Sequence, residues 1–81
     1  MMNQDRILKK IQDFFMERGV EITNEKLLNV NFIDDGYLDS FGILNFLVFL
    51  SDEFNFRLNP DDFSNENNKY IKTIIDLIIK S

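Results

Sequence analysis

The two residues best suited to take part in a reaction are Asp39 and Ser40. They lie where the turn-forming stretch Asp35-Gly36-Tyr37 meets an apolar run that begins at Phe41. A serine hydroxyl acts as a nucleophile when a general base stands beside it. The chain contains no histidine and no cysteine, so the commonest general base and the thiol nucleophile are both missing. Ser40 is therefore not a self-activated nucleophile, and its residue type and position alone favour a solvent-exposed serine in the first turn of a helix.

Other kinds of chemical site are poorly supported by the residue types and their spacing. A calcium-binding loop with Gly36 at its sixth position would place Ile33 at the third and Gly42 at the twelfth, where carboxylates are needed. Asp34 and Asp35 are better explained as turn and surface residues than as metal ligands. Glycine-rich phosphate loops and paired catalytic carboxylates are absent, and 81 residues leave little room for an enclosed active site. We predict that the chain is not an enzyme.

The charge is acidic overall and unevenly distributed. The net charge is −5, and residues 32–68 carry eight acids and one base, or −7, which leaves +2 for the rest. Two interpretations stay open: solvated loops and helix ends, or an acidic face for basic partners. Without a basic patch, we expect no nucleic-acid binding.

Neither membrane insertion nor export is expected from the sequence. No apolar run approaches the roughly 20 residues that span a bilayer. The first residues, Met1-Met2-Asn3-Gln4-Asp5-Arg6, lack the apolar segment of a signal peptide. We expect a cytoplasmic protein.

The first element that could position Ser40 is an amphipathic helix over residues 3–18. One apolar stripe runs through Ile7, Leu8, Ile11, Phe14 and Phe15. Asn3 is a suitable cap and Gly19 a suitable stop in the left-handed conformation. The following connection, residues 19–38, is long, but its apolar side chains can pin it to the helices. Thr23 or Asn24 could cap one helical turn within it.

Residues 41–54 are predicted to form a helix, although a buried strand competes because the run is almost entirely apolar. Its length and the capping residue Asp39 favour the helix, as does the 3–4 spacing of Phe41, Leu44, Leu47, Leu50 and Phe54. A helix that is apolar on most sides either lies centrally or presents apolar residues to a partner.

The C-terminal third predicts two further helices. Asn59-Pro60 followed by acids is a helix start, and a polar break over residues 64–68 keeps that helix short. The last helix carries Ile71, Ile74, Ile75 and Ile78 on one face and ends at Lys80. The fold class is therefore all-α: one domain over residues 1–81, built as a small helical bundle with an irregular crossing.

The pattern resembles the acyl carrier protein family. The residues that carry the resemblance are Gly36, Leu38, Asp39, Ser40 and Phe41, followed by an apolar helix that ends in Asp52-Glu53-Phe54. The resemblance covers nearly the whole chain, and the run from Leu38 to Gly42 is more similar to the D-alanyl and peptidyl carrier branches than to the fatty-acid branch. It implies an acyl-carrier-protein-like four-helix bundle with three main helices, one short helix and a long first loop.

The resemblance also implies a function for Ser40. In the family, this serine receives phosphopantetheine from coenzyme A through a separate magnesium-dependent phosphopantetheinyl transferase, and the thiol of the arm carries an acyl or aminoacyl group as a thioester. Asp39 would cap the helix and help to engage the transferase. Further partners would be a loading ligase and acceptor enzymes, and the carrier would act as a monomer.

Carrier proteins meet their partners mainly through the helix that follows the serine, so the resemblance implies a partner surface at Phe41, Leu44, Val48 and Asp52. The alternative is that Leu44 and Val48 belong to the core. Fatty-acid carriers typically show acids within this helix, where this chain has Asn45 and Ser51. We therefore expect a dedicated partner that uses apolar contacts.

Two narrower alternatives stay open. The chain could be a D-alanyl carrier that works with an adenylating ligase on cell-wall teichoic acid, or an unmodified acidic adaptor with the same fold. A regulatory DNA-binding bundle ranks last because of the charge. The sequence leaves the cargo, the pathway and the cognate enzymes open. Its nine phenylalanines suggest a filled core with little room for a long acyl chain.

Overall fold

Helices form where the apolar periodicity predicts them. The computed structural model describes residues 3–81. Met1 and Met2, which belong to the first residues examined for a signal peptide, lie outside the described residues, as does the side chain of Pro60. The elements are α1 (Gln4–Glu17), α2 (Asn24–Leu28), α3 (Ser40–Phe54), the 3-10 helices η1 (Pro60–Ser64) and η2 (Glu66–Lys69), and α4 (Ile71–Lys80). No strand forms within residues 3–81, which confirms the all-α class.

The predicted caps bound the first two helices. The Asn3 side chain accepts a hydrogen bond from the Arg6 N–H at 2.9 Å, and Gly19, at φ 82°, follows the end of α1. The hydroxyl oxygen of Thr23 accepts from the Lys26 N–H at 3.3 Å and begins α2 inside the long connection. Each cap satisfies a backbone N–H that has no partner within its own helix.

Residues 40–54 form a helix, so the strand alternative is wrong. Asn55 ends α3 in the left-handed conformation at φ 51°, where its N–H donates to the Ser51 carbonyl at 3.0 Å. The buried residues of α3 are Gly42, Phe46, Leu50 and Phe54. These residues recur every four positions, as expected for one face of a helix.

The polar stretch over residues 64–68 separates the short helix η1 from α4, as predicted, but it is not without structure. The 3-10 helix η2 begins within it, at Glu66. The Asn65 side chain accepts from the Asn67 N–H at 3.0 Å, and the Asn68 side chain donates to the Asp62 carbonyl at 2.7 Å. Short amide side chains thus supply hydrogen bonds that stabilise a tight turn in a stretch with no apolar periodicity. The short helix predicted after Asn59 is present as the 3-10 helix η1.

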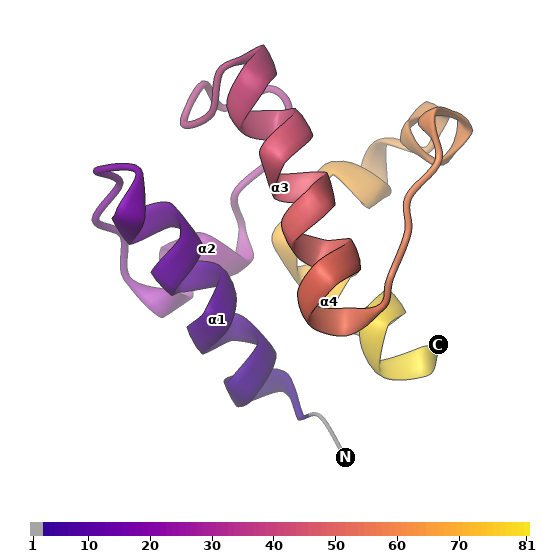
Figure 1. Cartoon of the computed structure of the whole chain (residues 1–81), viewed down its shortest axis with the longest axis horizontal. Coiled ribbons are helices and arrows are strands. Elements are labelled where there is room, and N and C mark those ends of the chain that lie inside the picture. Colours follow the sequence, from indigo (N-terminus) through magenta and orange to yellow (C-terminus); the bar gives the residue numbers. More distant parts are fainter. Residues whose placement is uncertain (1–2) are drawn as a thin grey trace.

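The helices pack around an aromatic centre. In Figure 1, α1 and α3 run side by side in opposite directions, and α4 passes behind α3. The Phe46 ring lies 5.3 Å from Phe14, 5.9 Å from Phe15 and 5.0 Å from Phe32, measured between ring centroids. Side chains from α1, α3 and the connecting loop therefore meet at one point, and the C-terminal end of α1 lies near the start of α3 (Figure 1).

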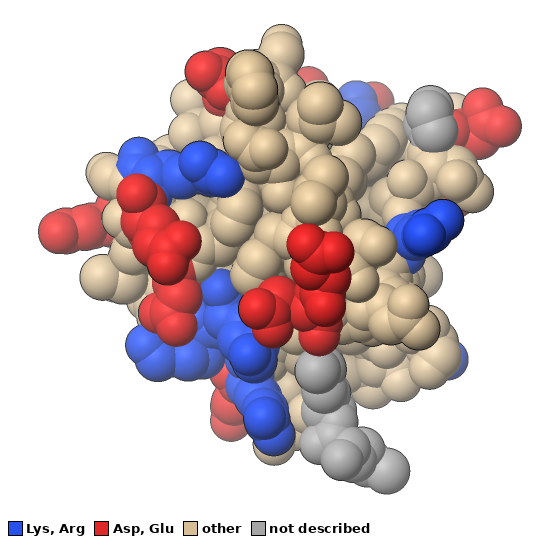
Figure 2. Space-filling view, in the orientation of Figure 1, with Lys and Arg blue, Asp and Glu red and all other residues tan. Residues whose placement is uncertain are grey.

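The charged side chains on the face in Figure 2 do not form one continuous acidic patch. Acidic and basic residues alternate around an uncharged area that covers much of α3. Three of the acids in residues 32–68 that the sequence singled out are paired with lysines: Glu53 with Lys10 at 3.1 Å, and Glu66 and Asp34 with Lys69 at 3.0 and 3.5 Å. Among residues 3–81, no helix has the length and apolar character needed to cross a membrane.

Candidate functional site

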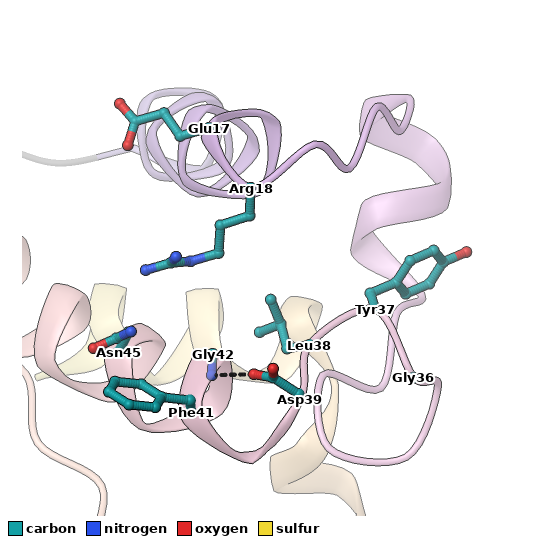
Figure 3. Close-up of a pocket in the computed structure, with 9 residues that line it drawn as sticks. All are labelled: Glu17, Arg18, Gly36, Tyr37, Leu38, Asp39, Phe41, Gly42 and Asn45. Carbon is teal, nitrogen blue, oxygen red and sulfur yellow. Dashed lines mark hydrogen bonds between the residues drawn. The ribbon is translucent and has the colours of Figure 1, made fainter.

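Ser40 is the first residue of α3, and its side chain is exposed to solvent. Asp39 precedes it in an extended conformation, and Oδ1 of Asp39 accepts a hydrogen bond from the Gly42 N–H at 2.7 Å (Figure 3). The Asp39 carbonyl accepts from the Ile43 N–H at 2.9 Å. Within residues 3–81 the Ser40 hydroxyl has no hydrogen-bond partner, so it is open to solvent.

Gly42 allows the preceding loop to close tightly onto α3. A Cβ atom at this position would lie 3.2 Å from Oδ1 of Asp39 and 3.3 Å from Cβ of Leu38. Leu38 is buried, so the residues that flank Ser40 on its N-terminal side are anchored to the helix. The sequence analysis missed this role of Gly42. The available signal was a glycine in the first turn of a helix, where it is a poor helix former.

A hydrogen-bonded turn centred on Asn31 fixes the loop further upstream. The Asn31 side-chain oxygen accepts from the Ile33 N–H at 3.0 Å and the Asp34 N–H at 2.8 Å, and its Nδ2 donates to Asp34 Oδ2 at 3.1 Å. The Asn31 N–H donates to Asp35 Oδ2 at 2.8 Å. Asn31 is buried, so these bonds satisfy polar groups that water cannot reach. Asp34 and Asp35 therefore act in a turn, as predicted.

This turn is attached to the C-terminal part of the chain. An isolated antiparallel bridge joins Asn31 to Tyr70. Lys69 adds ion pairs from its Nζ to Glu66 Oε1 at 3.0 Å and to Asp34 Oδ2 at 3.5 Å. The hydrogen bond with Glu66, helped by the charge of Asp34, raises the pKa of Lys69 above its ordinary value. The loop before Ser40 is thus held between α3 and the residues that precede α4.

The predicted partner residues lie on the exposed side of α3. Phe41, Leu44 and Val48 expose 72%, 60% and 52% of their surface, and Asp52 is also exposed. The alternative that Leu44 and Val48 belong to the core is wrong, because Phe46 and Leu50 occupy that position. The exposed apolar side chains follow Ser40 along α3 at helical spacing and form one stripe.

An open pocket of about 660 Å³ lies between the end of α1 and the start of α3. Asp39 and Phe41, the two neighbours of Ser40, both line it. Figure 3 shows the Arg18 side chain extending from α1 across the pocket toward Asn45 and Gly42. Arg18 was missed in the sequence analysis because its position depends on the packing of α1 against α3, which no local pattern reveals.

The remaining ionisable side chains do not converge on one point. Among residues 3–81, no group of three or more Asp or Glu side chains is placed to hold a metal ion. The carboxylate next to Ser40 in sequence is that of Asp39, and its Oδ1 atom caps α3. The functional group that this region offers is therefore the exposed Ser40 hydroxyl at the N-terminus of α3, next to an apolar stripe and an open pocket.

One of three comparisons with known proteins found a match. No family model matches the chain, and no solved structure matches it. The D-alanyl carrier protein of Streptococcus suis (strain 98HAH33) is 33% identical over 79 residues, which cover 93% of this chain and 94% of that protein. The similarity therefore covers almost the full length of both chains. The chain belongs to the carrier protein family.

Proposed function

We propose that this protein is an acyl carrier protein that holds an activated acyl or aminoacyl group as a thioester on a phosphopantetheine arm attached to Ser40. The observation that carries the proposal is the exposed hydroxyl of Ser40, without a hydrogen-bond partner, at the first position of α3, in a chain similar over 93% of its length to a carrier protein. The carrier domain would comprise residues 1–81.

The residues around Ser40 fit a phosphodiester. Ser40 and Phe41 occupy the first turn of α3, where backbone N–H groups lack partners within the helix. A negative charge at an exposed helix N-terminus is stabilised by about 0.3–1 kcal/mol. When attached, the phosphopantetheine group supplies a thiol, which the chain itself lacks because it has no cysteine.

The attachment reaction requires a base from the transferase. The Ser40 oxygen forms a bond to the phosphorus of the coenzyme A pantetheine phosphate, and the bond from that phosphorus to the adenosine bisphosphate leaving group breaks. We assign the acceptor of the hydroxyl proton to the transferase, because the chain has no histidine and Oδ1 of Asp39 already accepts from the Gly42 N–H. Asp39 would also help the transferase to recognise the site.

Mass spectrometry tests the attachment site directly. Incubation with coenzyme A and a phosphopantetheinyl transferase should add the mass of one phosphopantetheine and create one reactive thiol per chain. Ser40→Ala should gain neither. Ser64→Ala is a matched control, because Ser64 is also exposed and ends a 3-10 helix, and this variant should be modified as the wild type is. A mass gain in Ser40→Ala would contradict the proposal. So would the failure of several transferases to modify the wild-type protein.

We further propose that loading and acceptor enzymes dock on the stripe formed by Phe41, Leu44 and Val48, with Asp52 at its far end. The stripe begins beside Ser40, so a partner that covers it also reaches the attached arm. Exposed apolar side chains cost nothing to desolvate and supply most of their contact energy at the centre of an interface. The uncharged area over α3 supports a partner that uses apolar contact (Figure 2).

A D-alanyl carrier is the narrower candidate, and the similarity to the Streptococcus suis protein favours it. In that case an adenylating ligase would load D-alanine for transfer to teichoic acid. The modified protein should then form a hydroxylamine-labile adduct with D-alanine, ATP and the ligase, and none with L-alanine. An unmodified adaptor of the same fold would form no adduct and would keep its partner after Ser40→Ala.

A further inference from the structure

The pocket between α1 and α3 lies next to the proposed modification site. Asp39 and Phe41 flank Ser40 in sequence, and both line the pocket. Figure 3 shows that Glu17 and Tyr37, which also border it, point away from its centre. The groups left around the centre are Arg18, Leu38, Gly42, Asn45 and the Phe41 ring, together with the Asp39 carboxylate, which accepts from the Gly42 N–H. A flexible group attached to Ser40 can therefore reach the pocket past the two neighbours of the serine.

Arg18 gives the pocket a cation with unused hydrogen-bonding capacity. Its guanidinium carbon lies 4.4 Å from the centroid of the Phe14 ring, which holds the side chain by a cation–π contact. Among residues 3–81, Arg18 makes no ion pair with a carboxylate. A guanidinium carries five N–H donors and no acceptor, so it requires a partner that presents oxygen atoms.

We propose that this pocket is the resting site of the prosthetic arm, with Arg18 as its principal contact. The inference rests on the proposed function. A phosphopantetheine arm presents a phosphodiester anion, two amide groups and a dimethyl-substituted carbon. Arg18 donates to its phosphate or amide oxygens, the Asn45 carboxamide pairs with an amide, and Leu38 and Phe41 contact its methyl groups.

Covalent attachment makes this docking effective although the pocket is open. A ligand tethered by a short linker has an effective concentration of the order of millimolar. Contacts of about 4 kcal/mol, equivalent to a Kd near 1 mM, are then enough to keep the arm docked for a large share of the time. A partner enzyme that offers better contacts withdraws the arm readily, so docking limits exposure of the thioester without blocking transfer.

The apolar stripe of α3 is a poorer site for the arm. Leu44 and Val48 offer no hydrogen-bond donors, so the amides and the phosphate of the arm would lie against apolar side chains without partners. An arm held in the pocket on the α1 side leaves the stripe free for a partner. The carrier can therefore bind an enzyme before it releases the arm.

Because the chain has no cysteine, a nitroxide reagent would label only the thiol of the arm. Paramagnetic line broadening of backbone amides in the ¹⁵N-labelled protein then maps where the arm resides. We expect strong broadening at Arg18, Gly42 and Asn45, and several-fold less at these residues in Arg18→Gln. Arg57→Gln is the matched control, because Arg57 is an exposed arginine beyond the other end of α3, and its pattern should equal that of the wild type.

A second readout uses Arg18 itself. Its side-chain Nε–Hε resonance should shift when the unmodified protein is converted to the modified form, and that of Arg57 should not. Suppose that the mass confirms the modification but the line broadening is symmetric around Ser40, or is the same in Arg18→Gln as in the wild type. Either result would overturn the docking of the arm and leave the carrier function standing. Failure to gain mass would overturn both. Both variants alter exposed side chains, so loss of folding is not expected.

Discussion

Asp39 caps α3, and under the proposed function it would also help to engage the transferase. Its carboxylate accepts the Gly42 N–H at 2.7 Å, and its charge is available to a transferase. Asp39→Ala should lower the free energy of unfolding by about 1 kcal/mol through loss of the cap. Asp39→Asn retains a capping oxygen and should lose only the charge contribution, about 0.3–1 kcal/mol. Urea titration followed by circular dichroism measures both changes.

The rate of phosphopantetheine attachment separates the two roles. If the charge of Asp39 engages the transferase, Asp39→Asn and Asp39→Ala should slow attachment by similar factors even though their stabilities differ. A rate for Asp39→Asn equal to that of the wild type would limit Asp39 to its structural role. An unchanged urea midpoint for Asp39→Ala would contradict the cap.

The turn over residues 31–35, in the loop before Ser40, depends on hydrogen bonds made by Asn31. Asn31→Ala leaves the N–H groups of Ile33 and Asp34 without their acceptor in a partly buried turn, so we expect a loss of about 1 kcal/mol. Asn29→Ala is the control, because the Asn29 side chain is exposed and donates to the Glu25 carbonyl of its own short helix. That variant should stay within about 0.5 kcal/mol of the wild type. Equal urea midpoints for the two variants would show that the turn contributes no stability.

Capping residues were predictable from the sequence, whereas the residues that shape the loop were not. Asn3, Thr23 and Asp39 act on N–H groups three positions ahead, so their chemistry and their position are enough to identify them. Asn31 and Gly42 depend on contacts that form only when the chain has folded. The turn of Asn31 is attached to Tyr70, and Gly42 is required by the close approach of Leu38.

At the scale of elements, the sequence defined the extent of α3 but not its orientation. The nearly continuous apolar run makes several faces equally suitable for burial, and the 3–4 spacing that begins at Phe41 mixes exposed with buried residues. The aromatic side chains of α1 decide the orientation, because Phe14 contacts Phe46 and Phe49 at 5.3 and 4.9 Å between ring centroids. This packing leaves Phe41 and Leu44 in solvent.

The exposed stripe of α3 should therefore contribute to binding and little to stability. Leu44→Ser and Val48→Ser remove apolar side chains that are 60% and 52% exposed, so each should change the free energy of unfolding by less than about 1 kcal/mol. Each should weaken the docking of the loading enzyme by about tenfold, equivalent to about 1.4 kcal/mol. The Michaelis constant for the carrier protein in the loading reaction measures this effect.

Ile79→Ser is the matched control for the stripe, because Ile79 is 45% exposed near the end of α4. It removes a similar apolar surface without touching α3, so loading should proceed as in the wild type. Equal effects of Ile79→Ser and Leu44→Ser would indicate that general surface hydrophobicity, and not the stripe, governs loading. No effect of either would place the docking surface elsewhere.

At the scale of the whole molecule, the aromatic core determines what the carrier can enclose. The Phe46 ring is fully buried and lies 5.9 Å from Phe15, 5.0 Å from Phe32 and 6.1 Å from Phe49 between ring centroids. A ring in this position fills the space between α1, α3 and the loop. A long acyl chain would have to displace aromatic side chains from a closely packed interior, which strains the core.

We therefore expect the stability of the loaded carrier to be independent of acyl length. Thermal unfolding of a series from acetyl to decanoyl should give one melting temperature in the wild type, because the chain stays outside the core. Phe46→Ala should cost about 3–5 kcal/mol and leave a cavity. Phe46→Leu is the milder variant for use if that loss prevents folding, since a small domain has only about 3–5 kcal/mol of stability. In a folded variant, decanoyl should raise the melting temperature above that of acetyl by occupying the vacated space. A wild-type melting temperature that rises with acyl length would mean that the core opens to the cargo despite its aromatic packing.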